Sequence, residues 1–234
     1  MNVAITPPKI WCQTATGRAF NLVDPSPDAV DFWNDVALGL AKSGRYAGQL
    51  LPAYGPYSIA QHAIVGADWL HRNRRAWAHI APAVAAVDAA AAFLHHDDHE
   101  SYINDWPTPA VAAAAEVARR EFQKPSGYQG DHVVKSAVKT LKFNLDRAIY
   151  TAAGIAWPLP AELRRLVAWT DLGMLNAERR VLLAPPPEGW GEAIDAVPPL
   201  PVARKDLIPW SWDRVVDEYR TRLRRWSPSA VPVF

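Results

Sequence analysis

The sequence has almost no cysteine, little net charge and no long apolar segment. Among its 234 residues Cys12 is the single cysteine, which excludes an internal disulfide and a cysteine-based zinc cluster. The 25 basic and 24 acidic residues leave a net charge of +1, so no overall field attracts a nucleic-acid polymer or a membrane surface. The start MNVAITPPKI lacks a basic segment followed by an apolar one, and no later run is long and uncharged enough to cross a bilayer. We therefore expect a cytoplasmic protein with neither a membrane nor a nucleic-acid polymer among its partners.

Strict alternation of apolar and polar residues is also scarce, which leaves little signal for β-strands. Apolar residues instead recur with helical spacing among many alanines, so an all-α fold is expected. Ser58 is placed to cap one helix, and Pro82 and Pro109 suit the first turns of two others. The expected helices span residues 28–43, 58–73, 81–99, 107–122, 131–154, 160–184 and 211–226.

The C-terminal part differs in composition from the rest of the chain. Its stretch LAPPPEGWGEAIDAVPPLPVARKDLIPW is rich in proline but contains too many Trp, Leu, Ile and Val residues for a disordered linker. We expect a helical-bundle domain over residues 1–184 and, over 185–234, an irregular proline- and tryptophan-rich arm whose terminal helix packs on the same domain. Trp210, Trp212 and Trp226 suggest that this arm packs against the domain or against another subunit.

Three of the expected helices carry residue types that bind metals. In YSIAQHAIVGADWL, His62 lies in step with Ile59 on an apolar face, a pattern that by itself favours a hydrogen-bonded core histidine. His96 and Asp97 follow the small, apolar run AVAAVDAAAAFL and are expected near the C-terminal end of the next helix. Adjacent helical residues point about 100° apart, yet an imidazole and a carboxylate of different length can still converge on one ion.

Asp171 is expected on the buried side of the helix that contains LRRLVAWTDLGMLNAERRVLL. An isolated buried charge is costly, so this carboxylate needs either a bound cation or a buried arginine as its partner. Two histidines and two carboxylates form a mixed nitrogen and oxygen donor set that suits divalent transition metals. We therefore expect one divalent ion, either Co, Mn, Zn, Ni or Fe, with Mg also compatible.

The order of these residues resembles the HD superfamily of metal-dependent phosphohydrolases, whose signature is a histidine, a His-Asp doublet and a distant aspartate on a helical scaffold. The segment HDDHESYINDWPTP is similar to the HDxxExxxxDxPxP block of bacterial 5′-deoxynucleotidases and their phage relatives. WCQTATGRAFNLVDPSPDAVDFWNDVALGLAKSGRYAG, with YSIAQH after it, is similar to the opening of phage and prophage HD hydrolases, and LVAWTDLGMLNAERRVLL to their last metal-ligand helix. VPPLPV also has a counterpart there, so the resemblance covers most of the chain, whereas residues 124–142 do not align and are interpreted as an insertion near the site.

The resemblance implies an HD-domain helical bundle and a metal-ligand set, which would consist of His62, His96, Asp97 and Asp171. Because His95 precedes His96, the doublet could be displaced by one residue. We choose His96, since only a histidine directly before Asp97 preserves the doublet and its spacing to Glu100. The resemblance gives no role to the remaining histidines, which are interpreted as surface or structural residues: His71, His79, His99 and His132.

Two further acids match catalytic positions of the family. If the helix continues through Glu100, this residue lies on the same face as the doublet and can take a proton from water; the alternative is a solvent-facing acid. Asp105 would orient the water or protonate the leaving oxygen, held by a turn that Pro107 and Pro109 stiffen. The alternatives for Asp105 are an Asx turn or the N-cap of the following helix.

The substrate is expected to meet four side chains. Arg45 matches the family arginine that contacts phosphate, which its planar guanidinium can bind through two hydrogen bonds. Tyr46 would pack against the sugar and disfavour a 2′-hydroxyl, or else would only pack in the core. Arg18 is a second phosphate candidate or a surface arginine, and Trp106 would form a wall of a base pocket.

The resemblance thus predicts a metal-dependent phosphohydrolase of deoxynucleotides, located in the host cytoplasm if the gene is phage-borne, and a homo-oligomer. Its reaction would be either removal of phosphate from a deoxynucleoside monophosphate or release of triphosphate from a deoxynucleoside triphosphate, as in the dATP-type phage enzymes. Lys139 and Lys142 favour the longer phosphate chain. The main alternative is a nucleotide-binding HD regulatory module without turnover, against which the full set of site residues argues. An HD oxygenase is disfavoured because no additional histidine motif for a second iron is recognised.

Overall fold

The computed structural model describes residues 10–122 and 130–232 and is mostly helical, with 62% helix and 4% strand. The expectation of an all-α protein is confirmed at this level. Within these two ranges, no helix combines the length and the apolar character that crossing a bilayer requires.

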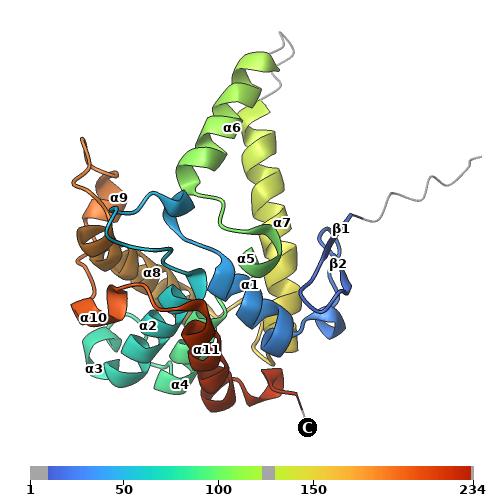
Figure 1. The fold of residues 1–234 in the computed structure, drawn as a ribbon, viewed down its shortest axis with the longest axis vertical. Helices are drawn as coiled ribbons and strands as arrows, with labels where there is room; N and C mark the ends of the chain where they lie inside the picture. The colour runs from blue at the N-terminus through green and yellow to red at the C-terminus, as the bar shows by residue number, and fades with distance from the viewer. Residues whose placement is uncertain (1–9, 123–129, 233–234) are drawn as a thin grey trace, which may run out of the picture.

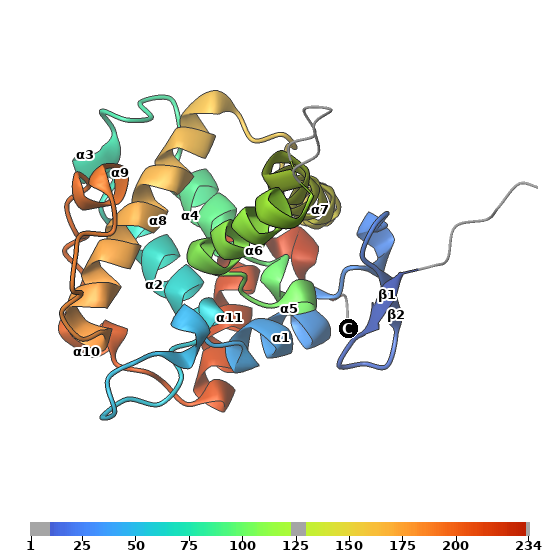
Figure 2. The ribbon, with the colours of Figure 1, turned by 90° about the horizontal axis from the view of Figure 1, so that it is seen from above.

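The centre of the molecule is formed by three helices that contact one another (Figures 1 and 2). These are α2 (Ile59–Arg72), α4 (Ala86–Leu94) and α8 (Ala161–Leu182). Helix α2 begins where predicted, because the Ser58 hydroxyl accepts a hydrogen bond from the backbone N–H of Gln61. The α2 and α4 helices approach closely at Gly66, where a Cβ atom would lie only 2.2 Å from the ring of Phe93. This close approach brings the C-terminal end of α4 next to the middle of α2.

Helices α6 (Thr108–Glu121) and α7 (Gly130–Ala152) form an antiparallel pair that projects away from the central helices (Figure 1). Pro109 lies in the first turn of α6 as expected. Residues 123–129, which connect the two helices and include part of the predicted insertion, lie outside the described residues. The C-terminal half of α7 returns to the body of the protein, where it can contribute side chains to the site.

Two of the expected helices are interrupted. The segment expected as a helix over 28–43 forms a 3₁₀ turn at Pro27–Ala29, a π-helical turn at Phe32–Val36 and helix α1 (Ala37–Lys42). The helix is interrupted because the Asp31 carboxylate accepts hydrogen bonds from the backbone amides of Trp33 and Asn34, which begin the π-helical turn. The helix expected over 81–99 begins only at Ala86 and ends at Leu94. Five residues of turn follow it, and then the short helix α5 (Glu100–Ile103).

A β-hairpin near the N-terminus was not predicted. Strands β1 (Trp11–Gln13) and β2 (Ala19–Asn21) pair antiparallel, and Phe20 of β2 stacks on Tyr102 of α5 with ring centroids 3.7 Å apart. Three residues in each strand are too few to give a recognisable alternation of apolar and polar side chains.

The chain after α8 returns across the central helices through two short helices, α9 (Glu192–Asp195) and α10 (Arg204–Leu207). The Gln61 amide nitrogen donates hydrogen bonds to the carbonyl groups of Asp206 and Ile208, which attaches this segment to α2. Helix α11 (Trp212–Trp226) then packs against α1, α2 and α4. Residues 183–226 therefore contact the same core as the preceding helices.

Candidate metal centre

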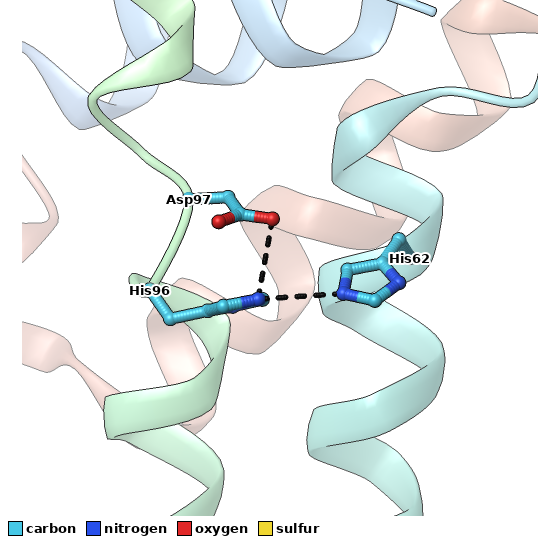
Figure 3. Close-up of side chains that lie close together, drawn as sticks. All are labelled: His62, His96 and Asp97. Atoms are coloured by element: carbon cyan, nitrogen blue, oxygen red, sulfur yellow. Dashed lines mark hydrogen bonds and ion pairs between the residues drawn. The ribbon is translucent and has the colours of Figure 1, made fainter. Parts of the chain in front are cut away.

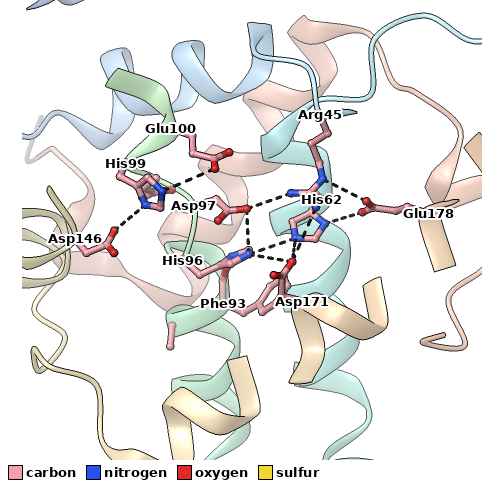
Figure 4. A network of polar contacts seen from close by, with 12 residues as sticks. Arg45, His62, Phe93, His96, Asp97, His99, Glu100, Asp146, Asp171 and Glu178 are labelled. Atoms are coloured by element: carbon pink, nitrogen blue, oxygen red, sulfur yellow. Dashed lines mark hydrogen bonds and ion pairs between the residues drawn. The ribbon is translucent and has the colours of Figure 1, made fainter. Parts of the chain in front are cut away.

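Four side chains from three places in the sequence converge at the end of α4. His62 comes from α2, His96 and Asp97 from the turn after α4, and Asp171 from α8 (Figures 3 and 4). The Nε2 atoms of His62 and His96 are 3.3 Å apart, and Asp97 Oδ2 lies 3.2 Å from His96 Nε2. Asp171 Oδ1 lies 3.2 Å from His62 Nε2 and 3.8 Å from His96 Nε2. All four predicted ligands are thus brought together.

Both imidazoles are oriented by an acceptor on their other nitrogen. His62 Nδ1 donates a hydrogen bond of 2.6 Å to Glu178 Oε1, and His96 Nδ1 donates one of the same length to the carbonyl oxygen of Phe93. A carboxylate or carbonyl acceptor holds the proton on Nδ1 and leaves the lone pair of Nε2 directed at the cluster, as in metal-binding histidines generally. Two such lone pairs 3.3 Å apart repel each other unless a cation lies between them.

The donor distances fit a bound divalent ion. Neighbouring ligands whose bonds to one ion are about 2.1 Å long lie roughly 3 to 3.5 Å apart in tetrahedral or octahedral geometry, which matches the separations of 3.2 and 3.3 Å found here. Histidine, aspartate and glutamate groups are therefore positioned to hold a metal ion. The set of nitrogen and oxygen donors suits a divalent transition metal, without selecting one.

Asp171 differs in one respect from the prediction, which placed it on a buried helix face. Its side chain is 41% exposed, because it lies at the open side of the cluster and not in the apolar core. The surrounding protein would raise the pKa of this carboxyl, but hydrogen bonds with His62 and His96 hold it below its ordinary value. The carboxylate is therefore ionised and accessible from solvent.

Arg45 and Tyr46 join the cluster from the loop after α1. Arg45 contacts three carboxylates: its Nη1 is 3.2 Å from Asp97 Oδ2, its Nε is 3.3 Å from Glu178 Oε2, and its Nη2 is 4.0 Å from Asp171 Oδ1. The Tyr46 hydroxyl donates a hydrogen bond of 2.6 Å to Glu178 Oε2. The Arg45 guanidinium thus reaches the edge of the predicted ligand set, and its most distant carboxylate is that of Asp171.

Glu178 is the site residue that the sequence analysis did not identify. It is fully buried, seven residues after Asp171 on α8, and this spacing places both carboxylates on one face of the helix. Burial would raise its pKa, but His62 and Arg45 lower the pKa below its ordinary value. The i to i+7 spacing within DLGMLNAE was the one signal that could have indicated it.

The ionisation of the doublet follows from the same contacts. Burial would lower the pKa of His96, but Asp97 and Asp171 raise it well above the ordinary value of a histidine. Burial would raise the pKa of Asp97, yet His96 and Arg45 lower it well below its usual range. In the metal-free protein a proton on His96 therefore supplies the positive charge that a metal ion would otherwise supply.

Glu100 lies beside Asp97 although the helix does not continue through it. The chain forms a turn in which the Glu100 amide donates to the Asp97 carbonyl oxygen at 2.9 Å, and Glu100 becomes the first residue of α5. Its side chain is buried, so the alternative of a solvent-facing acid is wrong. Burial, and next the charge of Asp97, raise the pKa of Glu100 to about 7. Lys142 Nζ lies 3.5 Å from Glu100 Oε1.

His95 and His96 point in different directions, which determines which histidine faces the cluster. His95 is fully buried and makes hydrogen bonds of 2.6 Å to Asp98 Oδ2 and 2.8 Å to the Ser227 hydroxyl. Tyr219 of α11 donates a further hydrogen bond of 2.6 Å to Asp98. His95 thus attaches the turn to the C-terminal part of the chain, and His96 is the member of the pair that faces Asp97 and His62.

A scan against models of protein families gives no match, and no curated protein is found to be similar to the chain. What the site can do must therefore be argued from its geometry. Oriented imidazole nitrogens, ionised carboxylates and one guanidinium form an arrangement that can bind a cation and, on the same side, an anion.

Asp105 and Trp106, two further residues predicted for the site, lie near the cluster but outside the set of four predicted ligands. Asp105 is half-buried, and Arg45 is close enough to lower its pKa, although burial raises that pKa overall. It does not cap α6, whose N-cap position is Pro107. Trp106 donates to the carbonyl oxygen of Ile103 and lines a groove of about 540 Å³ between α6 and α7.

Arg18 is not brought to the cluster. It follows the hairpin turn between β1 and β2, is 46% exposed, and its guanidinium forms ion pairs with Asp31 at 2.6 Å and Asp35 at 3.2 Å. These contacts fasten the hairpin to the π-helical turn, and they occupy the side chain that was expected to meet phosphate.

Proposed function

We propose that this protein is a metal-dependent phosphohydrolase of the HD superfamily that acts on deoxynucleotides. The observation that carries the proposal is a pair of Nε2 atoms 3.3 Å apart, each oriented by an acceptor on Nδ1 and each 3.2 Å from a carboxylate oxygen. Glu100, Arg45 and Lys142 adjoin this donor set, so that one acid and two cationic groups surround the place where a phosphate would meet the ion.

His62, His96, Asp97 and Asp171 would hold the ion in this proposal. A bound divalent ion lowers the pKa of a water ligand and polarises a phosphate oxygen. Glu100 is suited to accept the proton of the attacking water, because burial and Asp97 raise its pKa to about 7, close to neutral pH. Asp105, half-buried and near Arg45, is the candidate for donating a proton to the leaving oxygen.

Arg45 would bind phosphate through the part of its guanidinium that is least engaged. Its Nε and Nη1 are within 3.3 Å of carboxylates, whereas Nη2 is 4.0 Å from Asp171. The carboxylates fix the plane of the guanidinium in advance, so little side-chain entropy would be lost on binding. Tyr46 is fixed similarly through its hydroxyl, and its ring would then screen the ribose against a 2′-hydroxyl.

The groove between α6 and α7 favours a triphosphate over a monophosphate. It is lined by Trp106 and by the lysines at positions 135, 139 and 142, which recur along one face of α7. Lys142 connects the groove to the cluster through its contact with Glu100. Several ammonium groups in a row match a chain of phosphates better than a single one, and an indole face can stack on a base.

The deciding experiment is to incubate the metal-loaded protein with deoxynucleoside mono-, di- and triphosphates and to identify the products. We expect triphosphate release from deoxynucleoside triphosphates, with KM raised in Lys139→Gln and unchanged in Lys205→Gln, a control outside the groove. Release of orthophosphate from monophosphates would instead indicate a 5′-deoxynucleotidase. Nucleotide binding without any product would contradict hydrolysis and support the regulatory-module alternative.

A further inference from the structure

His99 shows the same arrangement as the histidines of the candidate metal centre, although the resemblance gave it no role. Its Nδ1 donates a hydrogen bond of 2.8 Å to Asp146 Oδ1 of α7 (Figure 4). This fixes the proton on Nδ1 and leaves the lone pair of Nε2 on the opposite side of the ring. The side chain is 6% exposed, and Nε2 has no hydrogen-bond partner in the part of the chain that the structure describes.

Glu100 supplies a second buried atom without a partner at the same place. Its side chain is also 6% exposed, and Oε2 accepts no hydrogen bond from any described residue. The other oxygen, Oε1, lies 3.8 Å from His99 Nε2 and 3.5 Å from Lys142 Nζ. Leaving two buried polar atoms unpaired is costly, so their convergence points to a ligand that contacts both.

Asp97 completes this group and connects it to the first centre. Ligand atoms of Asp97, His99 and Glu100 all lie within 4.8 Å of one another. The contacts of Asp97 with His96 and Arg45 both use Oδ2, which leaves Oδ1 for a ligand on the other side. A carboxylate can bind one cation with each oxygen, and pairs of metal ions in enzymes commonly share such a residue.

We propose that Asp97, His99 and Glu100 form a second divalent-cation site, with Asp97 shared between the two ions. One imidazole nitrogen and two carboxylates suit Mn, Fe, Co or Zn, and water would complete the coordination. Lys142 is 28% exposed, so its ammonium group can turn toward solvent when a cation takes its place beside Glu100. If the proposed function holds, the second ion would compete for the carboxylate that accepts the proton, and excess metal would slow hydrolysis.

The site is tested by titrating untagged, metal-free protein with Mn²⁺ and measuring free Mn²⁺ by EPR. We expect two ions bound per wild-type chain and one ion per chain in His99→Ala and in Glu100→Gln. The Glu100→Gln substitution is nearly isosteric and leaves the contact between His99 and Asp146 intact. His79→Ala, which removes an exposed histidine, is the matched control and should bind two. Asp97→Ala should lose both.

The spectrum at full loading gives a second readout that does not depend on activity. Two Mn²⁺ ions bridged by one carboxylate give an exchange-coupled signal, which should vanish in His99→Ala and Glu100→Gln while one bound ion remains. Saturation of the wild type at one ion, or two ions in both variants, would overturn the second site and leave the first centre untouched. Loss of hydrolysis with two coupled ions still bound would instead contradict only the proposed function.

Discussion

Glu178 allows the sharpest test of how the first centre is built, because it touches the centre only through other side chains. Its carboxylate accepts hydrogen bonds of 2.6 Å from both His62 Nδ1 and the Tyr46 hydroxyl, and lies 3.3 Å from Arg45 Nε. Glu178→Gln keeps the size of the side chain but removes its charge. One end of the amide is an NH₂ group, which cannot accept a hydrogen bond and must face either His62 or the Arg45 and Tyr46 pair.

Two magnitudes follow for this variant. Loss of the acceptor that orients a metal-binding histidine typically weakens metal affinity by about 10- to 100-fold, or about 1.4 to 2.7 kcal/mol. Removing one partner of a buried ion pair destabilises the folded protein by about 3 to 5 kcal/mol, because Arg45 keeps its charge. The amide oxygen still accepts from one side, so either His62 or the Arg45 and Tyr46 pair loses its acceptor, and Arg45 keeps its contact with Asp97. We therefore expect metal-free Glu178→Gln in the lower half of this range.

The effect on stability should depend on pH with a definite sign. Burial would raise the pKa of Glu178, but His62 and Arg45 lower it below its ordinary value. A carboxyl group with a lowered folded-state pKa stabilises the fold above the pKa of an unfolded glutamate, about 4.3. This contribution is lost as the pH falls through the folded-state value. The stability difference between wild type and Glu178→Gln should therefore shrink in acid.

The assay combines urea unfolding of the metal-free protein with chelator-competition measurements of Co²⁺ affinity. Glu188→Gln, which changes an exposed glutamate in the loop after α8, is the matched control and should leave both quantities unchanged. If Glu178→Gln binds Co²⁺ as tightly as wild type, the orientation of His62 by Glu178 does not matter for the metal, and the argument for a preformed centre fails.

Four further predictions concern the same part of the molecule. Asp97→Ala should no longer bind metal in stoichiometric amount, which metal analysis measures. Metal binding to the wild type should release a proton from His96, whose pKa is raised, and calorimetry in buffers of different ionisation enthalpy measures this release. Glu100→Gln should lose turnover while the first ion stays bound, because the amide cannot accept the proton; kcat and metal content are measured together. Gly66→Ala should destabilise the protein by about 1 to 3 kcal/mol in urea, because the new methyl group would lie 2.2 Å from Phe93 and must displace that ring.

Two of these variants, Asp97→Ala and Gly66→Ala, have a matched control on the same chain. Asp88→Ala removes an exposed aspartate from α4 and should keep full metal content. Gly55→Ala adds a methyl group where no atom lies within 4 Å and should leave stability unchanged. Full metal occupancy in Asp97→Ala, unchanged kcat in Glu100→Gln, or wild-type stability in Gly66→Ala would each contradict the corresponding assignment.

Helices with local start signals were predicted well from the sequence. Helix α2 was placed within one residue because Ser58 caps it, and α11 begins one residue later than expected. The interrupted segments were missed because side chains satisfy the backbone there: the Asp31 carboxylate accepts from two amides, and the His96 imidazole donates to the Phe93 carbonyl oxygen. Hydrophobic periodicity contains no information about such bonds.

The sequence identified the predicted metal ligands of the site, because their residue types and their order along the chain match the family signature. It did not identify the residues that only hold one of the site histidines in place. Proximity of His62, His96, Asp97 and Asp171 was expected from the resemblance. Glu178 supports His62 from 116 residues away, and Asp146 supports His99 from 47 away. Each of these two is an ordinary helix residue by sequence. The packing of α8 against α2 gives Glu178 its partner, and the packing of α7 against the turn after α4 gives Asp146 its partner.

The end of α4 at Leu94 explains how one short segment can serve three parts of the molecule. In a continued helix, residues 95–100 would point in directions fixed at about 100° intervals. In the turn that is present, His95 and Asp98 point toward α11, where Ser227 and Tyr219 bind them. Asp97 and His96 face α2 and α8, and the following His99 and Glu100 face α7. The run of titratable residues is therefore not a solvated helix end, because its side chains contact α11, the α2 and α8 pair, and α7. The Asp97 carboxylate lies between the group that faces α2 and α8 and the group that faces α7.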